Sequence, residues 1–310
     1  MSIVVIGTTF VDIKGFPEDT YIPTGRNVGR VEYIHGGVAR NVVEDIANVE
    51  LRPTFVGLVD DSPMGKDVLE KLKKHKVNCD YVITRPDGLG LWLAVFDNNG
   101  DVAGSISKRP NAYPMVDLLE QKGDEIFASA DSVVLQVDLH KDIVKKVFEL
   151  AEKYHTKLYA LVSNMSIAAE RRDFLQKFDC FICNQQEAGL LFLDDYEGKT
   201  VPEMQAILAD RVVRANIPAM VVTMGGDGAV FAERNGSSGY CPARNVIVKD
   251  TTGAGDAFCA GVAVGLTYGK TLAEAVNIGT YLAASVITSS ENVCPRFLPE
   301  ELGLDVKVSQ

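Results

Sequence analysis

The segment from Asp250 to Asp256 holds the residue types best suited to chemistry in this chain. It reads Asp250-Thr-Thr-Gly-Ala-Gly-Asp256 and runs directly into an apolar stretch with helical character. Glycines let a backbone turn tightly, and a helix N-terminus offers unpaired N–H groups and a partial positive charge. Such a loop can bind a phosphate and stabilise the charge that grows during its transfer. Asp256 would lie in the first helical turn, where its carboxylate can remove a proton from an attacking hydroxyl. Taken alone, the segment also fits an ordinary N-capping aspartate after a glycine loop.

A second motif, Gly36-Gly-Val-Ala-Arg-Asn41, stands immediately before a predicted helix. Paired glycines allow close approach of backbone to a ligand, and Asn41 supplies both a donor and an acceptor for reading a hydroxyl. Asp12 follows the first predicted strand, and a carboxylate at the end of such a strand lies where open α/β sheets bind ligands. It can accept hydrogen bonds from two adjacent sugar hydroxyls. The alternative for this motif is a glycine turn with a helix cap.

Two further motifs also follow predicted strands. The first is Asn184-Gln-Gln-Glu187, whose side-chain oxygens would face the same side of a helix start. Oxygen ligands of this kind suit Mg²⁺, usually through its waters, although a capping arrangement explains the same spacing. The second is Thr223-Met-Gly-Gly-Asp-Gly228, a glycine turn that can approach a phosphate or a ribose.

The elements that must position these motifs alternate between strand-like and helix-like segments, which is typical of a parallel sheet with helices on both faces. We therefore expect a three-layer α/β/α fold. The predicted strands cover 3–8, 54–59, 132–137, 158–162, 180–183 and 219–224. The predicted helices cover 39–48, 64–75, 141–154, 203–215, 254–267 and 271–288.

Two regions, 13–35 and 88–108, break this alternation with short β-type runs. The turn Asp97-Asn-Asn-Gly100 in the second region favours a hairpin. We expect both regions to pair into a small β-sheet outside the main sheet, forming a lid over the acceptor or a homodimer surface. A lid that closes would keep water from the reacting phosphate. The whole chain, 1–310, is predicted to be one domain that carries these lid segments.

Composition excludes several classes of partner. The 310 residues are 46% hydrophobic, which is enough for a large buried core, and the formal net charge is −11. An acidic surface repels phosphate backbones, which argues against nucleic acid as a partner. The start, Met1 to Phe10, is apolar but short and lacks a basic segment, so it is interpreted as a buried strand and not a signal peptide. The apolar stretch 254–266 is too short to span a bilayer. We therefore expect no membrane partner and a cytoplasmic protein.

Other nucleotide-binding motifs do not account for the glycine loops. The stretch from Gly265 to Thr271 comes nearest to a Walker A loop, but it has one residue too few between its glycines and follows a helix. The glycines at 225–228 are followed by a predicted strand and not by the helix that a dinucleotide fingerprint requires.

The four motifs, in this order, resemble the ribokinase family, also called the PfkB family of carbohydrate kinases. The resemblance runs from Gly7 to about Pro295, and both specific signatures, GGxxxN and DTxGAGD, are intact. It implies a ribokinase-like fold and an ATP-dependent kinase that transfers the γ-phosphoryl group to a hydroxyl of a sugar or nucleoside. A non-catalytic sugar or nucleoside sensor on the same fold is the alternative, and it would be expected to have lost part of the machinery.

The resemblance also implies residue roles. Asp256 is the base, and the amides of Gly253, Ala254 and Gly255 form the anion hole. Asn184 and Glu187 organise Mg²⁺. The acceptor is held by Asp12, Gly36, Gly37 and Asn41, and the ATP site is lined by Thr223, Gly225, Gly228 and Thr252. Family members often bind a monovalent cation, here K⁺, through backbone oxygens around Asp250 and Thr252 and the loop after the last long helix.

Two departures from the family pattern bear on the ligands. The loop 289–294 lacks the glycine that ribokinase carries, which puts the cation site in question. The stretch Lys108-Arg-Pro-Asn-Ala112 lacks a glycine before its Asn-Ala pair. Lys108 and Arg109 are interpreted as solvated charges of the small sheet, and the alternative is that they read a phosphate on the substrate.

Within the family, three short stretches look most similar to pseudouridine kinases. They are Gly29 to Asn41, Thr223 to Gly228, and Ser238-Gly239. Pseudouridine is therefore the leading specific acceptor, and ribokinase-type or fructokinase-type sugar phosphorylation is the alternative.

Overall fold

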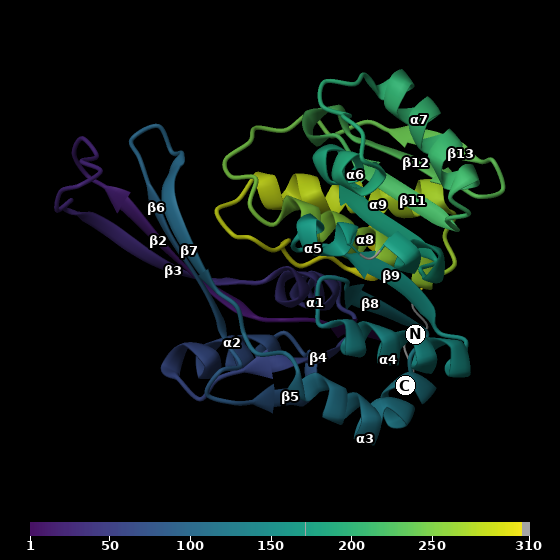
Figure 1. The fold of residues 1–310 in the computed structure, drawn as a ribbon, viewed down its shortest axis with the longest axis horizontal. Helices are drawn as coiled ribbons and strands as arrows, with labels where there is room; N and C mark the ends of the chain where they lie inside the picture. The colour runs from purple at the N-terminus through teal and green to yellow at the C-terminus, as the bar shows by residue number, and fades with distance from the viewer. Residues whose placement is uncertain (171, 306–310) are drawn as a thin grey trace.

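A nine-stranded sheet forms the centre of the computed structural model, which describes residues 1–170 and 172–305 (Figure 1). Its strand order is β13-β12-β11-β10-β9-β8-β1-β4-β5, and all neighbours from β11 to β5 run parallel. The two strands at the β13 edge are antiparallel hairpin partners. The strands are β1 (Ile3–Ile6), β4 (Thr54–Val59), β5 (Asn78–Thr84), β8 (Ser132–Gln136), β9 (Lys157–Leu161), β10 (Cys180–Asn184), β11 (Ala219–Thr223), β12 (Ala229–Glu233) and β13 (Ser238–Cys241).

Helices cover both faces of this sheet because each parallel connection needs a crossover. Alternate residues of β1 enter different cores: Ile3 and Val5 pack on one face, and Val4 and Ile6 on the other. The first face carries α1 (Val38–Asn48), α2 (Pro63–Lys74), α8 (Ala254–Thr267) and α9 (Leu272–Ile287). The second carries α3 (Pro114–Ala128), α4 (Lys141–Tyr154), α6 (Gln185–Phe192) and α7 (Val201–Arg214). The remaining short helices are α5 (Met165–Ala169), η1 (Arg172–Lys177), η2 (Gly225–Asp227) and η3 (Pro299–Leu302).

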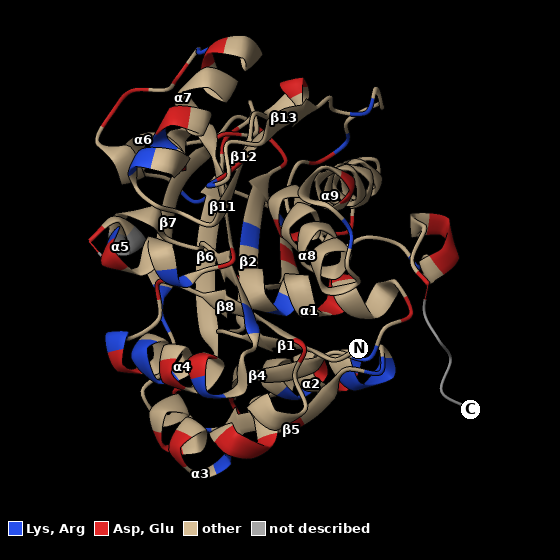
Figure 2. Ribbon diagram, turned by 90° about the vertical axis from the view of Figure 1, so that its right-hand side faces the viewer, with Lys and Arg blue, Asp and Glu red and all other residues tan. Residues whose placement is uncertain are grey.

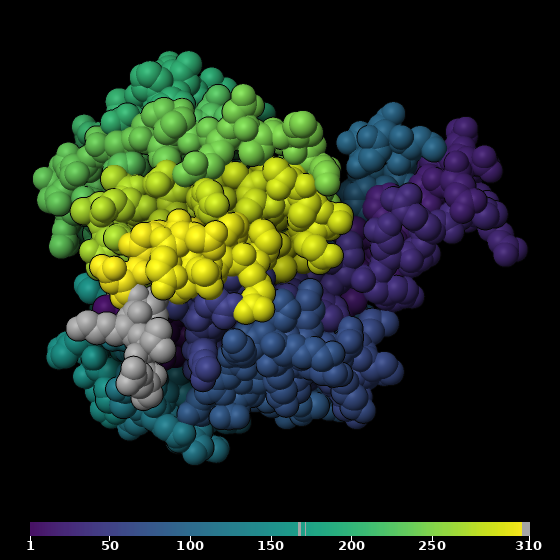
Figure 3. Space-filling view, turned by 180° about the vertical axis from the view of Figure 1, so that it is seen from behind, coloured from purple at the N-terminus to yellow at the C-terminus, as the bar shows by residue number. Residues whose placement is uncertain are grey.

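A second sheet of four strands projects from the body of the molecule (Figures 1 and 3). Its order is β3-β2-β6-β7, formed by β2 (Phe10–Pro17), β3 (Gly29–Gly36), β6 (Gly90–Phe96) and β7 (Val102–Lys108). Side chains alternate between its two faces. Asp12 and Trp92 are cross-strand partners and line a cavity on the inner face, whereas Ile13 and Leu93 share the outer face.

The three-layer fold with a small β-sheet is confirmed, and so are most element positions. Helices at 141–154 and 254–267 match their predictions. Helix α3 and strand β5 were not predicted. Charged residues gather along the outer helices such as α3 and α4, whereas α8 is almost free of them (Figure 2). Among the described residues, no helix is both long and apolar enough to cross a membrane.

The predicted position of Asp12 at the end of the first strand is wrong. Strand β1 ends at Ile6, and the chain then turns through Gly7, Thr8 and Thr9 into the small sheet. The backbone N–H of Thr8 donates to Oε1 of Gln136 at 2.9 Å, and this bond holds the turn by which the chain leaves the main sheet. Asp12 is the third residue of β2 and faces the body from the inner side of the small sheet.

Candidate active site

Helix α8 begins in the way that an anion-binding loop requires. Gly253 precedes it with φ 83°, a left-handed conformation that favours glycine, and a Cβ there would lie 2.0 Å from the carbonyl oxygen of Asn292. Asp256 stands in the first turn. The N–H of Ala254 donates to the Thr251 carbonyl at 3.3 Å, so it is partly engaged. Within the described residues, the N–H groups of Gly255 and Asp256 make no such bond, as expected for the first turn of a helix.

Asn41 reaches Asp256 from the opposite helix. Its Nδ2 donates to Oδ2 of Asp256 at 2.6 Å, and its Oδ1 accepts a longer, 3.4 Å bond from Nδ2 of Asn292. Helix α1 starts after Gly37, which has φ 92°. A Cβ on the neighbouring Gly36 would lie 2.6 Å from Oδ1 of Asp12, so this glycine leaves room for that carboxylate. The two glycines therefore bring the backbone of α1 close to both acidic groups.

Burial sets the protonation of these carboxyls. It raises the pKa of Asp256 to about 7, against the opposing effects of the Asn41 hydrogen bond and the Arg40 charge, and with added repulsion from Asp12 and Glu187. Burial also raises the pKa of Asp12, which the charges of Lys14 and Arg40 partly offset. A carboxyl with a pKa near 7 is matched to accepting a proton at neutral pH.

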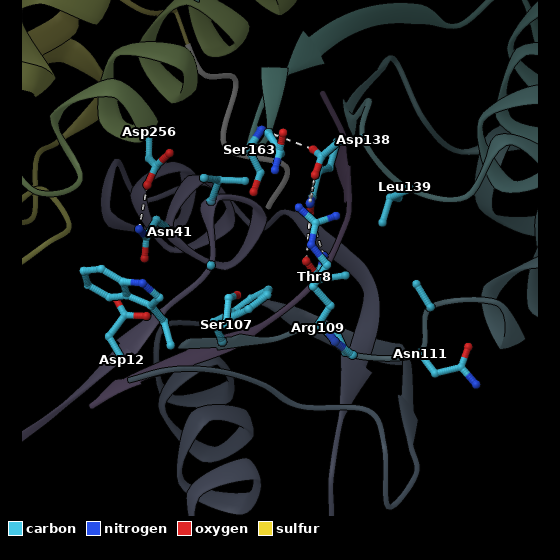
Figure 4. A pocket seen from close by; sticks show the side chains of 18 of the residues that line it. Thr8, Asp12, Asn41, Ser107, Arg109, Asn111, Asp138, Leu139, Ser163 and Asp256 are labelled. Carbon is cyan, nitrogen blue, oxygen red and sulfur yellow. Dashed lines mark hydrogen bonds between the residues drawn. The ribbon is translucent and has the colours of Figure 1, made fainter. Parts of the chain in front are cut away.

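A cavity of about 770 Å³ joins these groups, and six of the predicted site residues line it. They are Asp12, Gly37, Asn41, Thr252, Gly253 and Asp256. The volume lies within the usual range for a small-molecule site. Figure 4 shows Asp256, Asn41 and Asp12 gathered at one side of this cavity, with Asp138, Leu139 and Asn111 at the other.

Sequence reasoning missed the far side of the cavity. Asp138 and Gln136 stand at the carboxyl end of β8, which is where parallel sheets place ligand-binding groups. Their position after a predicted strand could have identified them as site residues. Arg109 is exposed, as the interpretation of a solvated charge predicts, but it also lines the cavity, and its charge acts on Asp138. Lys108 is exposed and does not line it.

Four of the remaining predicted residues lie outside the lining of this cavity, at or just after the carboxyl ends of strands β10 and β11. Asn184 of β10 pairs in register with Thr223 of β11. Gly225 and Gly228 follow β11 with φ 56° and φ 98°. A Cβ on Gly228 would lie 2.2 Å from the Cys241 carbonyl oxygen, so the turn requires glycine there. These residues form one edge next to the cavity.

Asn184 and Glu187 form a reciprocal capping box at the start of α6. Oδ1 of Asn184 accepts from the Glu187 N–H at 2.7 Å, and Oε2 of Glu187 accepts from the Asn184 N–H at 2.8 Å. Burial and the negative charge of Asp138 raise the pKa of Glu187. Asn184 and Glu187 therefore do cap the helix. The Glu187 carboxylate also lies in a negatively charged environment, where a bound cation would be favoured.

The described residues hold no group of three or more His, Cys, Asp or Glu side chains that could bind a metal ion. Mg²⁺ that arrives with nucleotide phosphates needs only one or two carboxylates and water. Glu187 fits that requirement. Asp250 uses Oδ1 to accept the Thr252 N–H at 2.8 Å, which shapes the loop before α8.

Comparison with known proteins agrees with this geometry. The model of the pfkB family carbohydrate kinase matches residues 1–294. The guanosine-inosine kinase of Exiguobacterium acetylicum is 35% identical over 292 residues, covering 94% of this chain and 95% of that protein. The pseudouridine kinase of Escherichia coli K12 is 24% identical over 278 residues, covering 88% and 86%. A structure of Arabidopsis thaliana ribokinase complexed with ribose and ATP has a TM-score of 0.81, 20% identity and 97% coverage of both chains, and so shares the fold.

The family match spans nearly the whole chain, and the guanosine-inosine kinase is 35% identical over 95% of its own length. This chain belongs to the pfkB family of carbohydrate kinases and is a phosphotransferase that acts on an alcohol group of a sugar or nucleoside.

Proposed function

We propose that this enzyme is an ATP-dependent nucleoside kinase that transfers the γ-phosphoryl group of ATP to a ribose hydroxyl. The observation that carries the proposal is Asp256, whose carboxyl faces the cavity from the first turn of α8 and has a pKa of about 7. A carboxylate in that position accepts the proton of the attacking hydroxyl, while the N–H groups at the start of α8 stabilise the transferred charge.

Asp12 and Asn41 are proposed to hold the ribose. Asp12 faces the same cavity from the small sheet, and its carboxylate can accept hydrogen bonds from two adjacent hydroxyls. Asn41 already donates to Asp256, so it can orient the base and the acceptor together. Gly36 and Gly37 provide the close approach of backbone that this arrangement needs.

ATP is proposed to bind along the carboxyl edge formed by Thr223, Gly225, Gly228 and Thr252. Glu187, with Asn184 beside it, would hold Mg²⁺ through water. When bound, Mg²⁺ would neutralise charge on the nucleotide phosphates. K⁺ is proposed to bind backbone oxygens around Asp250 and Thr252. The loop after α9 packs closely on this segment, since a Cβ added to Gly253 would lie 2.0 Å from the Asn292 carbonyl oxygen.

The specific acceptor is proposed to be a nucleoside of the kind that the two named relatives phosphorylate. The identity of 35% to a guanosine-inosine kinase supports guanosine and inosine. The short motif similarities and the identity of 24% to a pseudouridine kinase keep pseudouridine as the second candidate. The extent of the cavity supports a nucleoside over free ribose, because polar residues continue well beyond the group around Asp256.

We also propose a homodimer formed through the outer face of the small sheet. A cross-strand row of apolar residues lies there: Tyr33, Ile13, Leu93 and Ile106. Tyr33 is 61% exposed and Ile106 is 70% exposed. A continuous apolar row on an open sheet is costly to leave in water, and a second copy would bury it.

An ADP-release screen of the purified enzyme tests the proposed function. The acceptors are inosine, guanosine, pseudouridine, uridine, adenosine, ribose, fructose and fructose phosphates. We expect the highest kcat/KM with a nucleoside. ADP release that depends on a free sugar alone, or on a phosphosugar with Arg109 essential, would contradict the proposal. Absence of release with any acceptor would favour the sensor alternative.

A further inference from the structure

The far side of the cavity carries two charged groups that the proposed phosphoryl transfer does not use. Arg109 follows β7 of the small sheet, and Asp138 follows β8 of the main sheet. Both line the cavity, away from Asp256 (Figure 4). If the ribose is held at Asp12 and Asn41, as the proposed function requires, the base of a nucleoside extends toward these two residues. A role for them in binding that base therefore rests on the proposed function.

Asp138 presents a fixed acceptor. Its side chain is nearly buried, with 8% of its surface exposed. Oδ1 accepts the Ser163 N–H at 3.2 Å, and Oδ2 accepts a long, 3.5 Å bond from Nε2 of Gln136. A carboxylate can accept about four hydrogen bonds, so lone pairs remain for a ligand. Burial raises the pKa of Asp138, and the hydrogen bonds from Ser163 and Gln136, together with the smaller effect of the Arg109 charge, partly offset it.

Arg109 presents free donors beside that acceptor. Within the part of the chain that the structure describes, its guanidinium makes no hydrogen bond and no ion pair within 4 Å, although its charge acts on Asp138. An arginine carries five N–H donors in a planar fork and no acceptor. The lining of the cavity therefore offers donors on Arg109 and an acceptor on Asp138.

This pattern complements a particular edge of a nucleobase. In hypoxanthine and guanine a carbonyl oxygen, which accepts, stands next to a ring N–H, which donates, and the uracil ring of uridine and pseudouridine has the same arrangement. Adenine and cytosine show the reverse, an amino donor next to a ring nitrogen acceptor. Arginine pairs with such carbonyl oxygens and carboxylates accept from base N–H groups. We infer that Arg109 and Asp138 together read the carbonyl and N–H edge of an oxo-base, so that the enzyme selects oxo-nucleosides and rejects amino-nucleosides.

The neighbouring carboxylate also argues against a substrate phosphate at Arg109. A phosphate bound there would share the cavity with the Asp138 carboxyl, on which the Arg109 charge acts, and repulsion between like charges disfavours binding. A neutral carbonyl oxygen accepts from the guanidinium without that repulsion, and its adjacent N–H gives Asp138 a partner.

Inosine and adenosine provide the sharpest test, because they share the ribose and differ only in the polarity of this edge. We expect wild-type kcat/KM to favour inosine over adenosine by about 10²-fold or more, since a site built to bond polar groups strongly rejects an analogue that leaves them unpaired. Arg109→Gln and Asp138→Asn should each lower that ratio by at least about tenfold, mainly through the loss of inosine turnover. Lys108→Gln, at the exposed neighbouring position, should keep the wild-type ratio.

Nebularine, which has the ribose but neither the carbonyl nor the N–H, separates the outcomes further. It should be a poor substrate of wild type and should change little in the Arg109→Gln enzyme. Equal kcat/KM for inosine and adenosine in wild type would overturn the inference and leave a nucleoside kinase in place. An Arg109→Gln enzyme that keeps the wild-type ratio would overturn it as well. Turnover of sugars without turnover of any nucleoside would overturn the proposed function itself.

Discussion

Nδ2 of Asn41 donates to Oδ2 of Asp256 at 2.6 Å, joining residues that lie 215 positions apart in the chain. The bond crosses from the first turns of α1 to the first turn of α8, and it connects the two motifs that the sequence singles out. It favours the ionised carboxylate, against the burial that raises the pKa of Asp256. The contact therefore increases the fraction of enzyme in which the proposed base is ionised and can accept a proton.

The pH dependence of the reaction should report this contact. Asp256 must be ionised to act as a base, so kcat/KM should fall as pH drops below about 7, where the carboxyl takes up a proton. Asn41→Ala removes a hydrogen bond that lowers the pKa of Asp256, so the acidic limb should move to higher pH. Full pH profiles of wild type and variant provide the measurement.

Asn48→Ala is a matched control for that experiment. Asn48 lies further along the same helix, and its Nδ2 donates to the Cys294 carbonyl at 2.6 Å and not to Asp256. Loss of the Asn48 side chain should lower stability and leave the midpoint of the pH profile unchanged. An Asn41→Ala midpoint that is unchanged or moves to lower pH would show that this bond does not govern the base.

Glu187→Gln separates metal binding from helix capping. If Glu187 holds Mg²⁺ through water, the variant should need a higher Mg²⁺ concentration for half-maximal rate, since a neutral amide attracts the ion less. Glu203→Gln is the control, because Glu203 makes the same capping box with Thr200 at the exposed start of α7. Gln can replace Glu in a capping box, so both variants should keep their helix caps. Equal Mg²⁺ titrations for the two variants would reduce Glu187 to a capping residue.

The buried carboxyl of Asp45 should make stability depend on pH. Asp45 is fully buried, its Oδ1 accepts the Cys294 N–H at 2.6 Å, and its Oδ2 has no hydrogen-bond partner among the described residues. Burial raises the pKa of Asp45 well above its ordinary value. The folded state therefore keeps a proton that the unfolded chain releases, and the free energy of unfolding decreases as pH rises above about 4.

Asp45→Asn removes that titration while keeping the shape of the side chain. We measure the free energy of unfolding by urea at each pH. Between about pH 4 and about pH 8 it should fall for wild type, and Asp45→Asn should lack this fall. Asp19→Asn, at an exposed position between β2 and β3, should follow the wild-type curve. Parallel curves for Asp45→Asn and wild type would refute the assignment.

One charged substitution in the outer face of the small sheet should dissociate the proposed dimer. Ile106→Glu places a carboxylate in the apolar row of the outer face, so sedimentation should shift from dimer to monomer. Ile22→Glu changes a residue of similar character, 53% exposed, that lies outside this row, and it should remain dimeric. Wild-type enzyme that sediments as a monomer at micromolar concentration would rule out the interface.

Local patterns predicted the elements whose signals lie within a few residues. The loop and apolar run that form α8 are such a case, as are the glycines before α1. Helix α3 was missed because Gly123 weakens its helical signal, and that glycine is explained only by packing, since a Cβ there would lie 2.5 Å from Cδ1 of Leu150 on α4.

Residues brought together by the tertiary fold were harder to predict. Arg109 and Asp138 follow strands of different sheets, and no local spacing relates them. Asn292 likewise joins the site only through contacts with residues distant in the chain, among them His35 and Asn41. The predicted position of Asp12 was wrong because the turn after β1 depends on a hydrogen bond between Thr8 and Gln136, which lie 128 residues apart in the chain.

The central claim, that Asp256 is the base of a nucleoside kinase, is tested most directly by Asp256→Asn. This change keeps the size of the side chain and removes its basicity. With inosine or pseudouridine as acceptor, kcat should fall by about 10² to 10⁴ while ATP still binds, because the carboxylate acts on the hydroxyl proton and not on the nucleotide. An Asp256→Asn enzyme with near wild-type acceptor-dependent ADP release would contradict the account.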